Sequence, residues 1–279
     1  MAEESDKSLA RELTTLERQA EAILPMLRTA LNDLRSAASS AVRRIPVPRT
    51  DYFGRMTLYF HAKQLEHTTA ILTLDGHPDS TLVARSMLEG LCLLKWARAD
   101  AVERALMWHA FSLVIDWRHL RADELSGRAI DEAHRVSLNE RLVTEGARFL
   151  TDAALKANAA GTALPADPYR RTWYVGTLKD IFAAVGGSAL YDGPYKHMSD
   201  WHHWNPSGLA QGMWARDDTF GFDAASPVIA VGSFSNSFQA LADTALLVTD
   251  HFSLDSTAIL QLITAVEEAA KENDYGQDP

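Results

Sequence analysis

The clearest periodicity in the chain runs from Asp100 to Leu120, DAVERALMWHAFSLVIDWRHL. Its large apolar side chains recur at helical intervals and include Leu106, Leu113, Val114, Trp117 and Leu120. This spacing gathers apolar groups on one face of an α-helix, and Asp100 is a residue type that caps a first helical turn. The segment therefore predicts an amphipathic helix that ends near Ser126-Gly127.

Helical periodicity also dominates on both sides of this segment, and no run shows convincing strand-like alternation. We predict further helices at residues 7–42 (bent near Pro25), 51–74, 80–99, 128–159, 177–185, 195–204, 228–252 and 255–272. Residues 43–49, 161–168 and 205–226 are expected to be irregular, because they are rich in residues that interrupt helices. The predicted fold is all-α, an irregular bundle of about eight to ten helices. Residues 1–45 would form an N-terminal helical arm and residues 46–279 the main helical domain.

Composition restricts the classes of partner. The 279 residues carry a formal net charge of −10, and a surface that acidic repels a phosphate backbone unless a local basic patch overrides it. The one such patch is residues 28–55, which contain six arginines and only two aspartates. This patch can meet a nucleic acid, or equally an acidic surface of a second subunit.

Cellular location follows from what the chain lacks. Residues 1–6 are acidic and do not follow the basic-then-apolar plan of a secretory signal. No segment approaches the roughly 18 uncharged apolar residues that span a bilayer, so no membrane partner is expected. Cys92 is the only cysteine and lies in an apolar run, which predicts a small buried side chain and no disulfide. We expect a cytoplasmic protein.

A polar stripe is the most informative local feature. Residues 195–204, YKHMSDWHHW, place Tyr195, Ser199 and His203 at positions i, i+4 and i+8, which align along one face of a helix. A phenol, a hydroxyl and an imidazole flanked by Trp201 and Trp204 favour a partly enclosed polar pocket. The alternative is that the three groups only satisfy buried backbone and neighbouring side chains.

A charged pair lies inside the apolar segment 84–94. Arg85 and Glu89 are four residues apart, and charged groups in such a context are costly unless they are partnered. One or both are therefore expected to point at the polar stripe, within hydrogen-bonding reach of it. The alternative is an internal ion pair that fixes helix register. Our candidate catalytic residues are His203, Arg85, Glu89, Tyr195 and Ser199, and our candidate ligand-binding residues are Trp201, Trp204, Trp214 and His202.

These two segments carry a resemblance. Arg85-x-x-x-Glu89, followed later by Tyr195-x-x-x-Ser199-x-x-x-His203, resembles a bacterial all-helical family known as a domain of unknown function, over residues 50–255. The resemblance implies the helical architecture and the location of the site, but no reaction. In that family the histidine is often followed directly by proline or glycine. Here Trp204-Asn205 intervene before Pro206, so the end of the helix is expected to differ.

A second resemblance is to the HEPN ribonucleases of toxin and phage-defence systems, marked by arginine, four to six residues, then histidine. Arg55 with His61 and Arg104 with His109 fit this spacing. The imidazole would move the proton of the RNA 2′-hydroxyl, and the guanidinium would stabilise the phosphorane charge. Neither match has the polar residue that typically follows the arginine, and ten histidines among many arginines also produce such spacings by chance.

Three Asp-x-x-His pairs raise a metal hypothesis: Asp116/His119, Asp131/His134 and Asp200/His203. Residues three apart on a helix can ligate one ion in a bundle. The usual glutamate ligands are missing, although Glu89 can contribute, and the only cysteine lies in an apolar run. We therefore expect no metal and no cofactor in the purified protein.

Three functional hypotheses remain. The first is a metal-independent, HEPN-like ribonuclease of a stress or phage-defence system, in which His203 and Arg85 are the favoured pair. The second is a non-catalytic module that senses a small molecule or nucleotide held against tryptophans. The third is a metal-dependent bundle enzyme that uses the Asp-x-x-His ligands. The candidate partners are RNA or a small-molecule ligand, and a second copy of the chain through the N-terminal helix.

Overall fold

The computed structural model describes residues 2–43, 45–202, 213–216, 219–222 and 226–274, with side chains for 17–43, 45–200 and 226–271. The chain divides into two compact units. Unit 1 comprises Met1–Trp96 and Leu178–Pro279, and unit 2 comprises Ala97–Thr177. Helices make up nearly all of the described secondary structure, which confirms the all-α class. The division into an N-terminal arm (residues 1–45) and a main domain (residues 46–279) stays a prediction.

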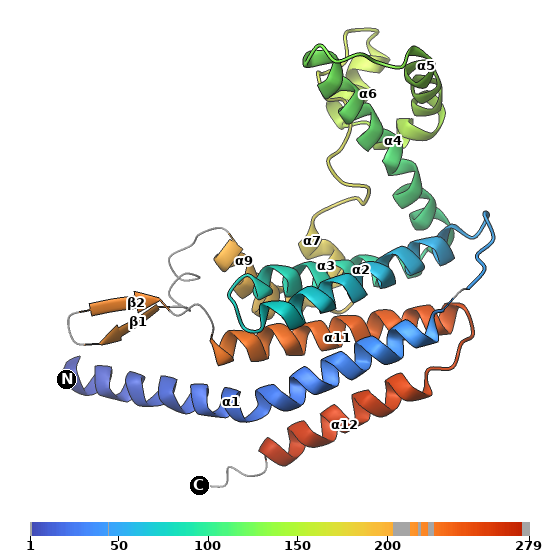
Figure 1. The fold of residues 1–279 in the computed structure, drawn as a ribbon. Helices are drawn as coiled ribbons and strands as arrows, with labels where there is room; N and C mark the ends of the chain where they lie inside the picture. The colour runs from blue at the N-terminus through green and yellow to red at the C-terminus, as the bar shows by residue number, and fades with distance from the viewer. Residues whose placement is uncertain (1, 44, 203–212, 217–218, 223–225, 275–279) are drawn as a thin grey trace. The chain divides into compact units, whose positions relative to one another are not determined.

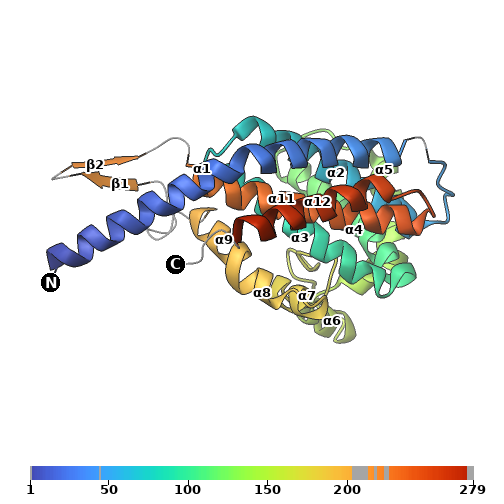
Figure 2. The same ribbon diagram turned by 90° about the horizontal axis from the view of Figure 1, so that it is seen from below.

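Unit 1 is built on long helices. Its helices are α1 (Ala2–Ala41), α2 (Tyr52–Leu74), most of α3 (Ser80–Arg98), α7 (Leu178–Ala184), α8 (Ser188–Leu190), the π-helical turn η3 (Tyr191–Tyr195), α9 (Lys196–His202), α11 (Pro227–His251) and α12 (Thr257–Asp274). α11 lies beside α1 and α2, and α12 packs on α1 (Figures 1 and 2). α1 continues through Pro25 as one helix. The core includes Leu31, Leu34, Met56, Ile71, Leu88, Leu91, Leu94, Phe234, Leu241 and Val248.

The end of α2 lies against the start of α11. Asp75 and Gly76 have positive φ values of 44° and 85°, which end α2 where the sequence predicted. A Cβ atom at Gly76 would lie 3.0 Å from the Ala230 Cβ and 3.2 Å from the Ser226 carbonyl oxygen. The Ser226 N–H donates to the Gly76 carbonyl at 3.2 Å. Both the backbone conformation and the available space therefore require glycine here.

The opposite ends of these helices meet at Asp51. One carboxylate oxygen accepts the Gly54 N–H at 2.7 Å and caps α2, and the other lies 3.0 Å from His251 Nε2 at the end of α11. The His251 ring also packs edge-on against Phe53 and Phe252. A Cβ at Gly54 would lie only 2.1 Å from Asp51 Oδ2, so the missing side chain makes room for the pair. This contact joins residues 200 positions apart.

We expect Asp51→Asn to change how stability depends on pH. Burial alone would raise the pKa of Asp51, but the hydrogen bonds from His251 and the Gly54 N–H outweigh it and hold the pKa below the ordinary 3.8. A depressed folded pKa stabilises the protein above pH 3.8, and this contribution is lost as the pH falls through the folded value. Asparagine still caps the helix but carries no charge.

The measurement is the free energy of unfolding in urea, for both proteins, between about pH 2 and pH 6. The wild type should be the more stable near pH 6, and the difference should shrink toward zero at the acid end. A difference that stays constant across this range would contradict an ionic role for Asp51.

Unit 2 corrects the predicted long helix over residues 128–159. Its elements are α4 (Ala101–Leu125), α5 (Glu132–Arg141), the π-helical turn η1 (Leu142–Gly146), the short 3-10 turn η2 (Ala147–Phe149) and α6 (Asp152–Ala159). The helix is interrupted at Leu150. Next to it, the Thr151 N–H donates to the Pro168 carbonyl, and the Arg170 N–H donates to the Phe149 carbonyl. Thr151 then caps α6. The helix ends because this backbone pairs with a distant segment.

A short hairpin lies within residues 205–226, which were expected to be irregular. β1 (Met213–Arg216) pairs antiparallel with β2 (Thr219–Phe222), in the register Met213 with Phe222 and Trp214 with Gly221. The two strands are too short for the alternation that a sequence pattern needs.

None of the described helices is long and apolar enough to cross a membrane.

Candidate functional site

The two segments singled out in the sequence meet at the phenol of Tyr195. α3 carries Arg85 and Glu89 one helical turn apart on one face, and η3 ends at Tyr195. Arg85 Nη2 donates to the Tyr195 hydroxyl oxygen at 2.8 Å, and that hydroxyl donates to Glu89 Oε2 at 3.3 Å. The phenol thus bridges a cation and a carboxylate. The expected contact between Arg85 or Glu89 and the polar stripe is present.

Aromatic packing holds the Tyr195 ring in place. The ring stacks on Tyr191, with centroids 5.2 Å apart, and lies tilted against the fully buried Phe182. The Arg85 guanidinium also lies over the ring face, 4.8 Å from its centroid, where a cation is attracted by the ring quadrupole. Tyr195 is itself only 5% exposed. Two aromatic rings and the Arg85 guanidinium therefore hold the Tyr195 ring with its hydroxyl toward α3.

The phenol of Tyr195 stays protonated. Burial and the neighbouring Glu89 carboxylate raise the pKa of Tyr195 to about 12, although Arg85 opposes this shift. A phenol with that pKa is a poor general base at neutral pH. It acts instead as a fixed hydrogen-bond relay that accepts from Arg85 and donates to Glu89.

Arg85 and Glu89 keep hydrogen-bonding capacity that the described residues do not use. Arg85 Nε is buried and has no partner among the described residues, and Tyr195 takes only Nη2. The bond to Glu89 is at the long end of the ordinary range. The structure shows no direct ion pair between these two described side chains, so the alternative of an internal Arg85–Glu89 pair does not describe it. Both side chains are partly exposed.

The rest of the stripe is only partly described. Ser199 lies in α9, and its hydroxyl donates to the Tyr195 main-chain oxygen at 2.8 Å rather than to the phenol. This is a local helical bond of the kind that the structural alternative expects. His203 and Trp204 lie outside the described residues. Trp201 and His202 end α9 and Trp214 lies in β1, but their side chains are not among those described.

In the first HEPN-like pair, Arg55 with His61, the histidine is buried in the helix packing. His61 is 3% exposed, and its Nε2 lies 3.3 Å from the Ala38 carbonyl, between α1 and α2. Burial lowers the pKa of His61, although the Ala38 carbonyl opposes the shift. The Arg55 guanidinium lies 4.7 Å from the Tyr52 ring centroid. An imidazole that solvent cannot reach does not serve an RNA substrate, which removes Arg55 with His61 as a catalytic pair. Arg104 and His109 both lie on α4 in unit 2.

The Asp-x-x-His pairs do not converge where they are described. Asp116 and His119 are exposed on α4, and the Asp131 carboxylate caps α5 by accepting from the Ala133 and His134 N–H groups. Within the described residues, no three His, Cys, Asp or Glu side chains are arranged to hold a metal ion. The third pair ends at His203, beyond those residues. The expected absence of metal stays a prediction.

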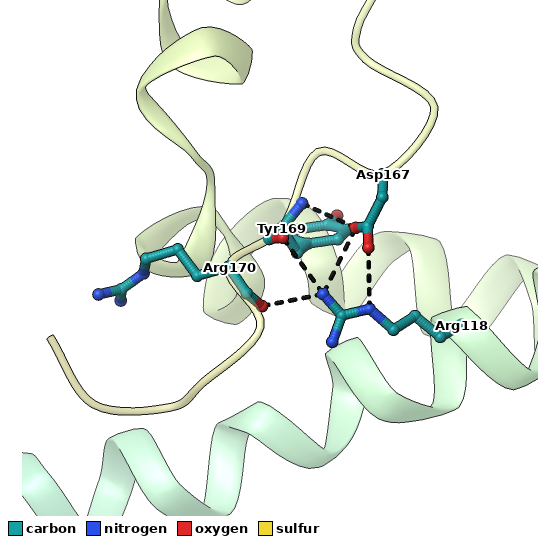
Figure 3. Close-up of polar contacts among 4 residues, drawn as sticks. All are labelled: Arg118, Asp167, Tyr169 and Arg170. Atoms are coloured by element: carbon teal, nitrogen blue, oxygen red, sulfur yellow. Dashed lines mark hydrogen bonds and ion pairs between the residues drawn. The ribbon is translucent and has the colours of Figure 1, made fainter. Parts of the chain in front are cut away.

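Unit 2 also contains an arginine clamp that no sequence pattern predicted. Arg118 on α4 donates through Nε to Asp167 at 3.1 Å, and through Nη2 to the main-chain oxygens of Tyr169 and Arg170 at 3.2 and 2.9 Å (Figure 3). Trp117 packs edge-on against the Tyr169 ring. The clamp holds the segment that breaks the predicted long helix. Because its acceptors are a side chain and two main-chain oxygens of the segment that pairs with residues 149–151, we assign it a structural role.

Comparison with known proteins adds a family. No curated protein and no solved structure matches the chain. The model of a family of unknown function (DUF5677) matches residues 55–220, which is more than half of the chain. This span contains both segments that meet at Tyr195. The chain therefore belongs to this family of unknown function.

Proposed function

We propose that the cluster of Arg85, Glu89 and Tyr195 is the recognition centre of a site for a nucleotide-like ligand, and that the chain is a ligand-sensing module. The observation that carries the proposal is the Tyr195 hydroxyl held between the two charged groups, while Arg85 Nε has no partner in the described part of the chain. A fixed donor and a fixed acceptor side by side suit a ligand that presents the complementary pair of groups.

Binding is better supported than catalysis by the described residues. Tyr195 is a neutral relay, as its raised pKa requires, and Ser199 is engaged by the backbone. Neither is placed to accept a proton near neutral pH. An acid–base mechanism would therefore depend on His203 or on the Glu89 carboxylate, whereas recognition needs only Arg85, Glu89 and the phenol that orders them.

The metal-independent ribonuclease is the second candidate, with His203 as general base and Arg85 as the group that meets the phosphorane charge. One observation favours it: Arg85 is a permanent cation with an unused donor, and it contacts η3, which continues directly into α9 and toward His203. The carboxylate of Glu89 counts against it, because it repels a phosphate brought to the same place.

The test is thermal unfolding of the purified chain with each of the four ribonucleoside monophosphates. Ligand at about a hundred times its Kd should raise the midpoint by several degrees, because binding to the folded state alone stabilises it. Arg85→Lys should remove the shift, and Glu89→Gln should reduce it at the same ligand concentration. The control Ser86→Ala, an exposed neighbour on α3, should keep it. A wild type that responds to none of the four, or a shift that stays unchanged in both variants, would overturn the proposal.

A further inference from the structure

The spacing of the two charged groups limits what lies between them. Arg85 Nη2 and Glu89 Oε2 each bond the same phenol oxygen, at 2.8 and 3.3 Å, so they are at most about 6 Å apart. They form no direct ion pair in the described structure. The further N–H groups of Arg85 and the second oxygen of Glu89 are therefore close enough to contact neighbouring groups of one flat heterocycle, and too close to serve two separate ligands.

A charged ligand satisfies only half of this arrangement. A phosphate or carboxylate would accept from Arg85 but meet repulsion from Glu89, and an ammonium group would do the reverse. A neutral ring that carries acceptors and N–H donors next to each other satisfies both without adding charge. The bases of nucleic acids are such rings, which fits the nucleotide-like ligand proposed above.

Guanine makes more bonds to this pair than the other bases do. Its O6 and N7 both accept from one guanidinium, which is the commonest specific contact between arginine and a base. Its N1–H and N2–H2 groups are parallel donors, and a carboxylate can accept both. Adenine, cytosine and uracil each lack one of these doubled contacts. We propose that the Arg85–Glu89 site selects guanine, an inference that rests on the proposed ligand-binding function.

An aromatic surface adjoins the pair. Tyr191 stacks on Tyr195 with an interplanar angle of 19°, and its own ring is partly exposed. Bases stack on such rings regardless of sequence, so Tyr191 adds affinity while Arg85 and Glu89 determine which base binds. The buried Phe182 supports both tyrosines from the other side and keeps the surface rigid.

Two analogues test each half of the contact without changing the protein. Inosine monophosphate lacks the N2 amino group that would donate to Glu89, and 7-deaza-GMP lacks the N7 that would accept from Arg85. Isothermal titration of the wild-type chain should find GMP bound at least about tenfold more tightly than AMP, CMP or UMP. Each analogue should also bind roughly tenfold more weakly than GMP, the cost of one bond to a charged group.

The variant Glu89→Gln tests whether the Glu89 carboxylate recognises the N2 amino group. Its side chain has nearly the same shape and can still accept from Tyr195, so circular dichroism should show an unchanged fold. Its affinities for GMP and inosine monophosphate should be equal, because the discriminating carboxylate is gone. If another nucleotide binds the wild type as tightly as GMP and depends on Arg85, the guanine inference fails while the ligand-binding function stands. If no nucleotide binds, both fail.

Discussion

Gly54→Ala is expected to lower the free energy of unfolding by about 2 kcal/mol, although alanine is the better helix former by ~1 kcal/mol. The added Cβ would lie 2.1 Å from Asp51 Oδ2 and 2.9 Å from His251 Nε2. The Asp51 carboxylate must then leave both its cap and its pair with His251. Loss of an N-cap typically costs about 1 kcal/mol, and forced overpacking costs about 1–3 kcal/mol.

Gly90→Ala is the matched control, because it makes the same change inside α3. Its Cβ would meet only Gln64 Nε2 at 3.5 Å and Phe60 Cδ1 at 3.9 Å, which is ordinary contact. Urea denaturation should show a lower midpoint for Gly54→Ala and an equal or higher midpoint for Gly90→Ala, with unchanged slopes. In an Asp51→Ala background the Gly54 substitution should cost little. A full loss in that background would show that the Asp51 collision is not the cause.

The helices that depend on local signals were predictable from the sequence. α2 ends at Asp75-Gly76, because chain-breaking residues act within a turn. α4 begins after Asp100 as predicted, although the Asp100 side chain makes no capping hydrogen bond. The predicted helix over residues 128–159 failed for a non-local reason. The interruption at Leu150 is stabilised by backbone hydrogen bonds to the segment near Pro168. The hydrophobic periodicity of residues 128–159 cannot predict a hydrogen bond to a segment distant in sequence.

In the candidate site, too, local features could be predicted and non-local contacts could not. Arg85 and Glu89 stood out because two charges in an apolar helix require partners, and the structure supplies Tyr195 as that partner. The stripe spacing pointed to Tyr195 and also to Ser199, whose hydroxyl donates to the main-chain oxygen of Tyr195. Spacing on one helix predicts a shared face, but it does not predict which neighbour a hydroxyl chooses. Contacts such as Asp51–His251 and Arg118–Asp167 join distant positions and left no local pattern.

If the second candidate function holds, His203→Ala is expected to reduce RNA cleavage by about a hundred- to ten-thousand-fold, the usual loss when a general acid or base is removed. In this hypothesis an imidazole takes the 2′-hydroxyl proton, and the described part of the Tyr195 cluster contains no imidazole. The Tyr195 phenol, with a pKa of about 12, cannot replace that imidazole. The thermal midpoint of this variant should stay close to that of the wild type.

His61→Ala provides the opposite result and therefore the control. His61 is buried against the Ala38 carbonyl, so its loss leaves a gap between α1 and α2 and should lower the thermal midpoint. At a temperature where this variant is folded, its cleavage rate should match the wild type. Unfolding of His203→Ala would instead make the stripe structural. Wild-type protein that leaves tRNA and mRNA intact would remove the ribonuclease hypothesis and leave recognition by Arg85 and Glu89 as the function to test.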